Sequence, residues 1–478
     1  MDVIFLDPYI EQTGGNIGLG YLSSVLLEKG HRVHVMGANK GIDEINQKIR
    51  EIDADIIGFS IRSNDTKQIS ELAMGIKKKK EALVICGGAH ITMNGRSFLE
   101  ENLCFDLGVV GEGEETIVDI IDFIMGKKKI KDIKGIIGRD NSRIFHTEKR
   151  EFIKDLDRLI FPAYNVFDIY ANGISEYGMI TSRGCPYGCT YCNGPNIMGK
   201  RWRYRSVDNI LEEFIKVKES YGKEIKWVDI FDDNFTLNLE RAKKLCRSLI
   251  NEKLDLQWRL PNGIRADKID DELAALMMEA GCRIVHVGIE SGCQDVFNSI
   301  NKGETLEDIE RGVKLLKKHG IKTDASFIIG LPKSNYWRDM KSIEFAQKLQ
   351  LHITCFHIFF PFKHTKAYDM TYQDKGVRVL RSDNETPIQY WSGKPYSIFD
   401  TEDYPEKDRI KVFMKGNLRF NDYLFTRDFS KSPYTLERLF TLFKIIFQYD
   451  PVFMPSHIFR LIKKFITSVG KRLYEKMT

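Results

Sequence analysis

The sequence predicts an α/β protein in three parts: a doubly wound parallel-sheet domain, a partial barrel of six βα units, and a mostly helical C-terminal region. Two series of strand–helix alternation indicate this fold class. The first occupies residues 1–125, where short β-branched runs are followed by amphipathic stretches. The second begins at residue 176 and continues through six units. Such alternation is typical of parallel sheets covered by helices.

We therefore expect four segments: an α/β domain at 1–140, a connector of little periodicity at 141–175, the barrel at 176–375, and the C-terminal region at 376–478. The strands expected in the first domain are 3–7, 31–37, 55–61 and 82–88. Those expected in the barrel are 178–184, 226–233, 256–263, 283–290, 324–330 and 353–360. Ligands of both fold types bind at the carboxyl ends of the strands, where we look for functional residues.

Composition excludes several classes of protein. A net charge of +5 over 478 residues gives no reason to expect a nucleic-acid partner. Met1 leads directly into a strand-like run with no basic segment before it, so we expect no signal peptide. We therefore expect a cytoplasmic location. The longest apolar stretch, residues 439–447, is too short to span a bilayer and contains Lys444.

Three of the nine cysteines gather on one loop after the first barrel strand. Cys185, Cys189 and Cys192 lie in TSRGCPYGCTYCNGP with the spacing C-x3-C-x2-C. Three thiolates can each bind one iron of a cubane and leave the fourth iron without a protein ligand. The sequence therefore predicts a [4Fe–4S] cluster with one open iron.

Two other interpretations of these cysteines fit the sequence less well. A zinc knuckle needs a fourth Cys or His at short spacing, and none follows Cys192 for more than fifty residues. Three unrelated core cysteines are a poor fit, because the segment is rich in glycine and loop-like.

With this loop in this place, the chain resembles the radical S-adenosylmethionine superfamily, whose hallmark is the same spacing in a partial (βα)6 TIM-type barrel. Further segments resemble it in the same order: DIFDDNFT (229–236), NGIRAD (262–267), VGIESGCQDVFNSINKG (287–303) and FIIGLP (327–332). The resemblance implies that S-adenosylmethionine chelates the open iron and is cleaved to a radical after one electron arrives. It singles out no catalytic side chain.

The resemblance implies four candidate ligands of S-adenosylmethionine, and each has a plainer alternative. Glu290 ends its strand and would bind the ribose or amino group, unless it is a surface carboxylate. Asp233 is favoured over Asp232, because adjacent strand residues point to opposite faces. Arg265 would pair with the methionine carboxylate or form an ordinary salt bridge. Tyr191 would lie near the adenine or simply pack in the core.

The first 140 residues resemble the cobalamin-binding domain found in a large subclass of these enzymes, a flavodoxin-like or Rossmann-like fold. The shared segments are DIIGFS, VICGGAH and VVGEGEET. The implied cobalamin-binding residues are Ser60, Gly87, Gly88, His90, Gly111, Glu112 and Gly113. The loop at residues 7–16 has no histidine, so cobalamin is expected without histidine ligation. Two alternatives stay open, since the glycine pair also suits a tight turn and His90 a solvent-facing loop.

The resemblance implies a cobalamin-dependent methyltransferase that acts on an unactivated carbon of a small molecule or lipid, with a reductant such as flavodoxin or ferredoxin. One alternative is an oxidative cyclase or carbon–carbon coupling enzyme with the same cofactors. Another is a cobalamin- or cluster-based sensor without turnover. Residues 459–478 form a basic amphipathic pattern, which suits a docking helix or a peripheral contact with a membrane surface.

Overall fold

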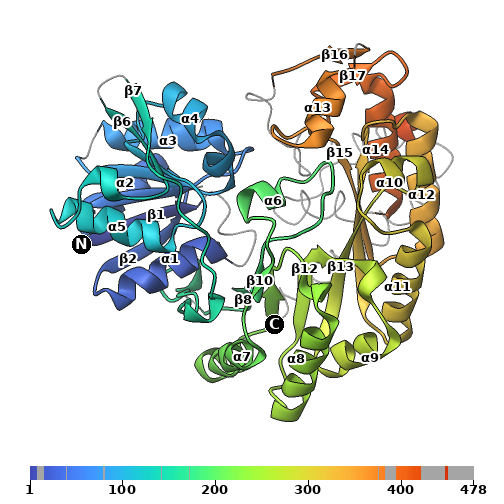
Figure 1. Cartoon of the computed structure of the whole chain (residues 1–478), viewed down its shortest axis with the longest axis horizontal. Coiled ribbons are helices and arrows are strands. Elements are labelled where there is room, and N and C mark those ends of the chain that lie inside the picture. The colour runs from blue at the N-terminus through green and yellow to red at the C-terminus, as the bar shows by residue number, and fades with distance from the viewer. Residues whose placement is uncertain are drawn as a thin grey trace, which may run out of the picture.

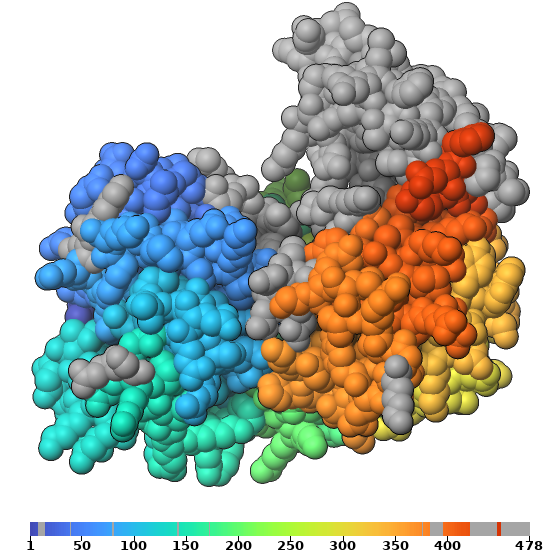
Figure 2. All heavy atoms as spheres, turned by 90° about the horizontal axis from the view of Figure 1, so that it is seen from above, coloured from blue at the N-terminus to red at the C-terminus, as the bar shows by residue number. Residues whose placement is uncertain are grey.

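The computed structural model describes residues 1–7, 15–38, 40–78, 81–140, 143–171, 173–374, 376–382, 395–420 and 447–450. Two α/β bodies lie side by side in it (Figures 1 and 2). The sheet of the first and the partial barrel of the second confirm the expected fold class. The basic tail at 459–478 lies outside the described residues. Among those residues, no helix has the length and apolar content that crossing a bilayer requires.

The first body is a seven-stranded sheet in which the first five strands are parallel and the last two antiparallel. In spatial order the strands are β2 (Arg32–Gly37), β1 (Asp2–Asp7), β3 (Ile56–Ser60), β4 (Leu83–Gly87), β5 (Leu107–Val109), β6 (Ile136–Asp140) and β7 (Arg143–His146). The expected boundary at residue 140 falls inside the β6–β7 hairpin. Backbone pairing such as Ile137 with His146 therefore extends this domain into the segment expected to be a connector.

Helices cover both faces of this sheet, as a doubly wound fold requires. They are α1 (Ile17–Glu28), α2 (Ile42–Ile52), α3 (Thr66–Lys77), α4 (Ala89–Glu101) and α5 (Glu114–Ile124). Apolar side chains of α1 and α5 pack on one face with Val3 and Phe5 of β1. Those of α2, α3 and α4 pack on the other face with Ile4 and Leu6. Alternate residues of one strand thus enter two separate cores.

The second body is a six-stranded parallel sheet with the order β15-β14-β13-β12-β11-β8. Its strands are β8 (Glu176–Met179), β11 (Trp227–Ile230), β12 (Trp258–Ile264), β13 (Cys282–Glu290), β14 (Lys322–Ile329) and β15 (Ile353–Ile358). Its longer helices are α7 (Val207–Tyr221), α8 (Leu239–Glu252), α9 (Asp271–Glu279), α10 (Gln294–Ser299), α11 (Leu306–Lys318) and α12 (Tyr336–Leu349). All six expected strands are confirmed, and in the described chain β8 and β15 do not pair, so the barrel is open.

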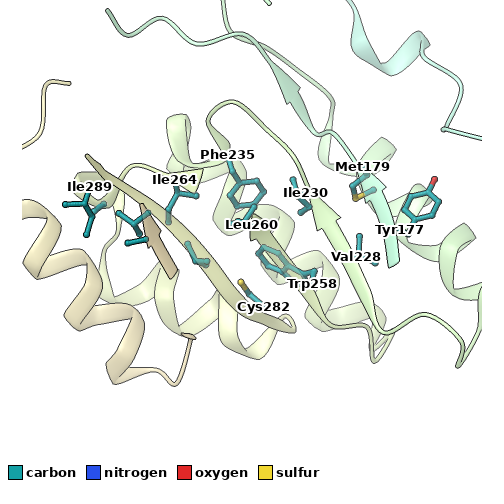
Figure 3. Close-up of a cluster of buried hydrophobic side chains, with 14 of the residues drawn as sticks. Tyr177, Met179, Val228, Ile230, Phe235, Trp258, Leu260, Ile264, Cys282 and Ile289 are labelled. Atoms are coloured by element: carbon teal, nitrogen blue, oxygen red, sulfur yellow. The ribbon is translucent and has the colours of Figure 1, made fainter. Parts of the chain in front are cut away.

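A buried apolar layer holds the barrel strands against their helices. Figure 3 shows part of it, with Val228 and Ile230 of β11 beside Trp258 and Leu260 of β12. Every residue in this layer is at least nine-tenths buried. The layer fixes one side of each strand, so the intervening residues face the concave side of the barrel.

The segment from 147 to 175 is packed, although its sequence has no clear periodicity. Tyr164 and Phe167 are buried, and the Tyr164 hydroxyl donates to the Gly178 carbonyl of β8 over 2.9 Å. At the other sheet, the Val35 amide of β2 donates to the Val166 carbonyl over 2.9 Å. This segment therefore ties the edge strands of both sheets together.

The start of the C-terminal region is only partly helical. A hairpin of β16 (Val377–Val379) and β17 (Phe399–Thr401) precedes α14 (Glu406–Phe420). The side chain of Asn417 on α14 accepts from the Phe356 amide and donates to the Phe356 carbonyl, each over 3.0 Å. It occupies the outer edge of β15 as a neighbouring strand would.

A buried ion-pair network joins the two bodies. Glu112 and Glu114 follow β5, while Arg183 and Arg203 lie on the short ribbon of β9 (Ser182–Arg183) and β10 (Arg203–Tyr204). Arg183 donates to Glu112 over 2.9 Å and to Glu114 over 2.5 Å, and Arg203 donates to Glu112 over 2.8 Å. The Ile153 amide adds a hydrogen bond to Glu112 of 2.6 Å. No side chain of the four is more than 7% exposed.

Removing one partner from this network should leave a buried charge without compensation. We expect Glu112→Ala to lower the free energy of unfolding by about 3–5 kcal/mol, measured by urea denaturation. Glu148→Ala is the control, since its pair with Lys134 is exposed, and should cost less than about 1 kcal/mol. Equal effects of the two substitutions would contradict a structural role for the buried network.

Candidate functional site

The cysteine loop joins β9 to the short helix α6 (Gly194–Ile197), which lies between the two bodies and contacts α4 of the first (Figure 1). It begins at Gly184, whose φ is +87° and at which an added Cβ would lie 2.5 Å from the Arg201 carbonyl oxygen. Only glycine fits such a position. The Gly184 amide donates to Asp233 over 2.7 Å. The carboxyl end of β11 thus fixes the start of the loop.

Other parts of the barrel hold the remainder of the loop. The Thr190 amide donates to the Ile300 carbonyl over 2.9 Å, and the Thr190 carbonyl accepts from Ala367 over 2.8 Å. The Asn301 side chain donates to the Gly188 carbonyl over 3.1 Å. Gly188 and Thr190 of the loop are therefore positioned by segments more than a hundred residues away in the chain.

The three thiols suit an iron–sulfur cluster. Burial raises the pKa of Cys185, Cys189 and Cys192, that of Cys192 to about 11, so the thiolates form when a metal supplies positive charge. A cubane takes each of three thiolates on a different iron, which suits three cysteines spread along one loop.

Two of the candidate S-adenosylmethionine ligands meet beside the cysteine loop. The Tyr191 hydroxyl donates to Glu290 over 2.8 Å, and Lys302 lies 3.4 Å from the same carboxylate oxygen. Glu290 has a φ of +67° and follows a register shift between β13 and β14. A non-glycine residue in this conformation is strained, and such strain gathers at functional sites. Lys302 was not predicted, because no local pattern places the Asn-Lys-Gly turn beside a strand end.

Arg265 forms the ordinary salt bridge that was the alternative to a role in binding the methionine carboxylate, with Asp267 as its partner. Its guanidinium donates to Asp267 over 3.0 Å, to the Gly303 carbonyl over 2.8 Å and to the Lys302 carbonyl. The group also lies 3.8 Å from the ring centroid of Tyr187 in the cysteine loop. Its donors are thus engaged within the protein, and it supports the cysteine loop and the Lys302 turn instead of facing an open pocket.

The two aspartates after β11 have separate roles. Asp232 is buried and accepts from the amides and hydroxyls of both Thr181 and Ser182. Asp233 is less buried and holds the Gly184 amide. Burial raises the pKa of Asp233. The choice of Asp233 as the pocket-facing residue stays a prediction, and its described contact is with the cysteine loop.

Several predicted cobalamin-binding residues gather at the carboxyl ends of β3, β4 and β5. Ser60 accepts from the Asn16 side chain over 2.9 Å, and Gly111 donates to Thr92 over 3.1 Å. Gly87 ends β4, and Gly88 follows with a φ of +98°. An added Cβ at Gly88 would lie 2.9 Å from the Ile61 carbonyl oxygen, whereas at Gly111 it would meet nothing within 4 Å. Gly88 therefore shapes the turn, and Gly111 leaves room at the edge.

His90 also belongs to this edge, with its Nδ1 3.1 Å from the Ser63 hydroxyl. Burial lowers its pKa to about 4, and the charge of Lys363 in the barrel contributes. His90 lies in the first turn of α4 and is only partly exposed, so the alternative of a solvent-facing loop histidine is wrong.

Glu112 and Gly113, the two remaining candidates for cobalamin binding, are both engaged in contacts within the protein. Glu112 is held by Arg183 and Arg203, so the prediction that it binds cobalamin is replaced by a role in docking the domains. Gly113 precedes α5, where an added Cβ would lie 3.1 Å from Leu22. It permits close packing of α5 against α1. Most of the loop at residues 7–16 lies outside the described residues.

The first body is a parallel sheet with helices on both faces, and the second is a partial barrel with three cysteines on one loop. This combination is typical of a radical S-adenosylmethionine enzyme with a cobalamin-binding domain. The family model of the radical SAM superfamily matches residues 179–346, and that of the B12 binding domain matches residues 9–121. The chain belongs to this superfamily, and both predicted resemblances are confirmed.

Known proteins are similar over most of the chain. An uncharacterized methyltransferase of Pyrococcus horikoshii is 31% identical over 366 residues, which span 75% of this chain and 78% of that protein. The anaerobic magnesium-protoporphyrin IX monomethyl ester cyclase of Rubrivivax gelatinosus is 25% identical over 468 residues, or 91% and 81% of the two chains. The structure of the methyltransferase TsrM from Kitasatospora setae, with cobalamin and a [4Fe-4S] cluster bound, shares the fold at a TM-score of 0.68 and 18% identity, covering 81% of this chain and 78% of that one.

The cysteine assignment is tested by iron content. After anaerobic reconstitution, we expect each of three variants, Cys185→Ala, Cys189→Ala and Cys192→Ala, to lose most of its bound iron. Each should also lose the broad visible absorption of an iron–sulfur cluster, because no other described side chain replaces the missing thiolate. Cys104→Ala is the control, since Cys104 is buried in the first body, and it should keep both. Full iron binding in the three loop variants would refute the assignment.

The backbone of the loop is tested at Gly184. We expect Gly184→Ala to reduce iron incorporation severalfold, because its Cβ would displace the backbone around Arg201. Gly126→Ala provides a matched control, since Gly126 also has a positive φ but has open space around it. If both substitutions lower iron incorporation equally, then backbone strain alone accounts for the loss.

Proposed function

We propose that the protein is a cobalamin-dependent radical S-adenosylmethionine methyltransferase that methylates an unactivated carbon. The observation that carries the proposal is that α6, which directly follows the cysteine loop, contacts α4, which begins at the predicted cobalamin edge after Gly88 (Figure 1). When bound, the cluster supplies the electron that cleaves S-adenosylmethionine, and cobalamin supplies the methyl group. The sequence similarity to the Pyrococcus methyltransferase supports this proposal.

The residues of the chain contribute binding and positioning. Cys185, Cys189 and Cys192 hold the cluster, while Tyr191 and Glu290 offer a hydroxyl and a carboxylate beside it. Ser60, Gly87, Gly88, His90 and Gly111 form the cobalamin edge. The buried network of Glu112, Glu114, Arg183 and Arg203 holds that edge opposite the cysteine loop. These contacts fix the distance between the two cofactor sites.

The partners of this reaction belong to the proposal. The substrate is a small molecule or lipid, and a flavodoxin or ferredoxin supplies electrons. We propose a cytoplasmic location, with the basic tail at 459–478 as a peripheral contact with the membrane surface. Flotation with anionic vesicles, with and without this tail, tests the membrane contact.

Methyl transfer is tested with labelled S-adenosylmethionine. The reconstituted enzyme, cobalamin, dithionite and an extract of the source cells should yield a product that carries the labelled methyl group and is about 14 Da heavier per event. The same reaction with the Cys189→Ala variant is the control and should yield none.

The outcomes separate the alternatives. A product that has lost hydrogen without gaining label would favour the oxidative cyclase, which the Rubrivivax relative makes the second candidate. Failure to release 5′-deoxyadenosine under strong reduction would favour a sensor without turnover.

A further inference from the structure

Three neighbouring strands of the barrel present polar side chains to its concave side. Along β13, β14 and β15, buried positions alternate with half-buried ones. The buried set, such as Ile289, packs in the apolar layer toward the helices (Figure 3). The half-buried set therefore faces inward. Apart from Arg283 at the start of β13, which donates to the Met278 carbonyl, its polar members are His286, Asp324, Ser326, Cys355 and His357.

Two of these residues are in direct contact. The parallel register pairs Ser326 with Cys355 and Ile328 with His357. The Ser326 hydroxyl lies 3.4 Å from Nε2 of His357. The serine and the histidine thus form one polar patch across β14 and β15.

His286 extends this patch along β13. It lies two residues before Gly288, which pairs with Ser326 in the sheet. Within the described chain, His286 has no hydrogen bond to either ring nitrogen, so its polar groups are free to bind another molecule. His286 lies four residues before Glu290 on the same strand, and the Glu290 carboxylate accepts from Tyr191 of the cysteine loop.

The concave face favours an uncharged ligand group. Burial lowers the pKa of both histidines, that of His357 to about 4, so both rings are neutral near pH 7. Nearby cations are compensated: Arg259 pairs with Asp229 and Glu176, and Lys302 with Glu290 and Glu304. A phosphate or carboxylate would find no uncompensated positive charge among these groups.

We propose that His286, Ser326 and His357 form the substrate-binding site and recognise an uncharged hydrogen-bonding group, a hydroxyl, carbonyl or amide, close to the reacting carbon. A neutral imidazole carries one donor and one acceptor, and the Ser326 hydroxyl beside His357 can also donate and accept, so the three residues together suit such a group. The inference rests on the proposed function for the reaction but concerns the substrate class.

The test compares leucine and glutamine at the two histidines. The variants are His286→Leu, His357→Leu, His286→Gln and His357→Gln, and His146→Leu on β7 of the first body is the control. The probe is the fraction of source-cell extract that accepts labelled methyl groups from the wild-type holoenzyme. Iron content and 5′-deoxyadenosine release without extract are measured for every variant.

We expect each leucine variant to need at least about ten times more of the active fraction for half-maximal methylation, because a buried hydrogen bond is lost. Iron content and basal 5′-deoxyadenosine release should stay unchanged. Each glutamine variant should recover most of the loss, since an amide can still donate and accept. The control should behave as wild type.

Two results would overturn the inference: leucine variants with a wild-type half-saturating amount, or leucine variants that also lose iron and basal release. Failure of the proposed function gives a different result. In that case the extract stimulates 5′-deoxyadenosine release by the wild type without methyl transfer. The amount of extract needed for half-maximal stimulation of 5′-deoxyadenosine release is then measured instead. A tenfold increase in the leucine variants would still support a substrate-binding site, and no increase would overturn it.

Discussion

The buried ion pairs between Glu112, Glu114, Arg183 and Arg203 are the interaction on which the arrangement of the two domains depends. Buried charges are costly unless they are paired, so the domains gain this contact in one relative orientation only. Because Arg183 lies two residues before Cys185, the same contact that docks the first domain also anchors the start of the cysteine loop. Docking and cofactor placement are thereby coupled.

The cysteine loop is held by residues from distant parts of the sequence. Asp233 follows β11, Asn301 follows α10, and Ala367 lies in α13 (Lys366–Tyr372). No single element supports the loop, so its geometry depends on the assembled barrel. A cluster held by this loop would therefore depend on the folded barrel for the positions of its three thiolates.

The sequence predicts the strands well, because buried parallel strands read as β-branched runs with clear ends. It also locates the cysteines, since their spacing is local. It could not reveal Arg265 as a support for Tyr187, or Glu112 as a docking residue, because both roles depend on partners 70 or more residues away. The prediction that residues 141–175 form only a connector is wrong for a related reason. Tyr164 and Phe167 are buried between the two sheets, and no periodic pattern in the sequence indicates this packing.

The contact of Asn417 with Phe356 has a consequence for solubility. An open barrel has two edge strands, here β8 and β15, and exposed strand edges invite pairing with other molecules. One amide side chain satisfies the middle of β15, and α14 covers the strand around it. A shortened chain that ended before residue 406 would lose this cover and expose the edge to self-association, even though the cysteine loop and the cobalamin edge would be intact in sequence.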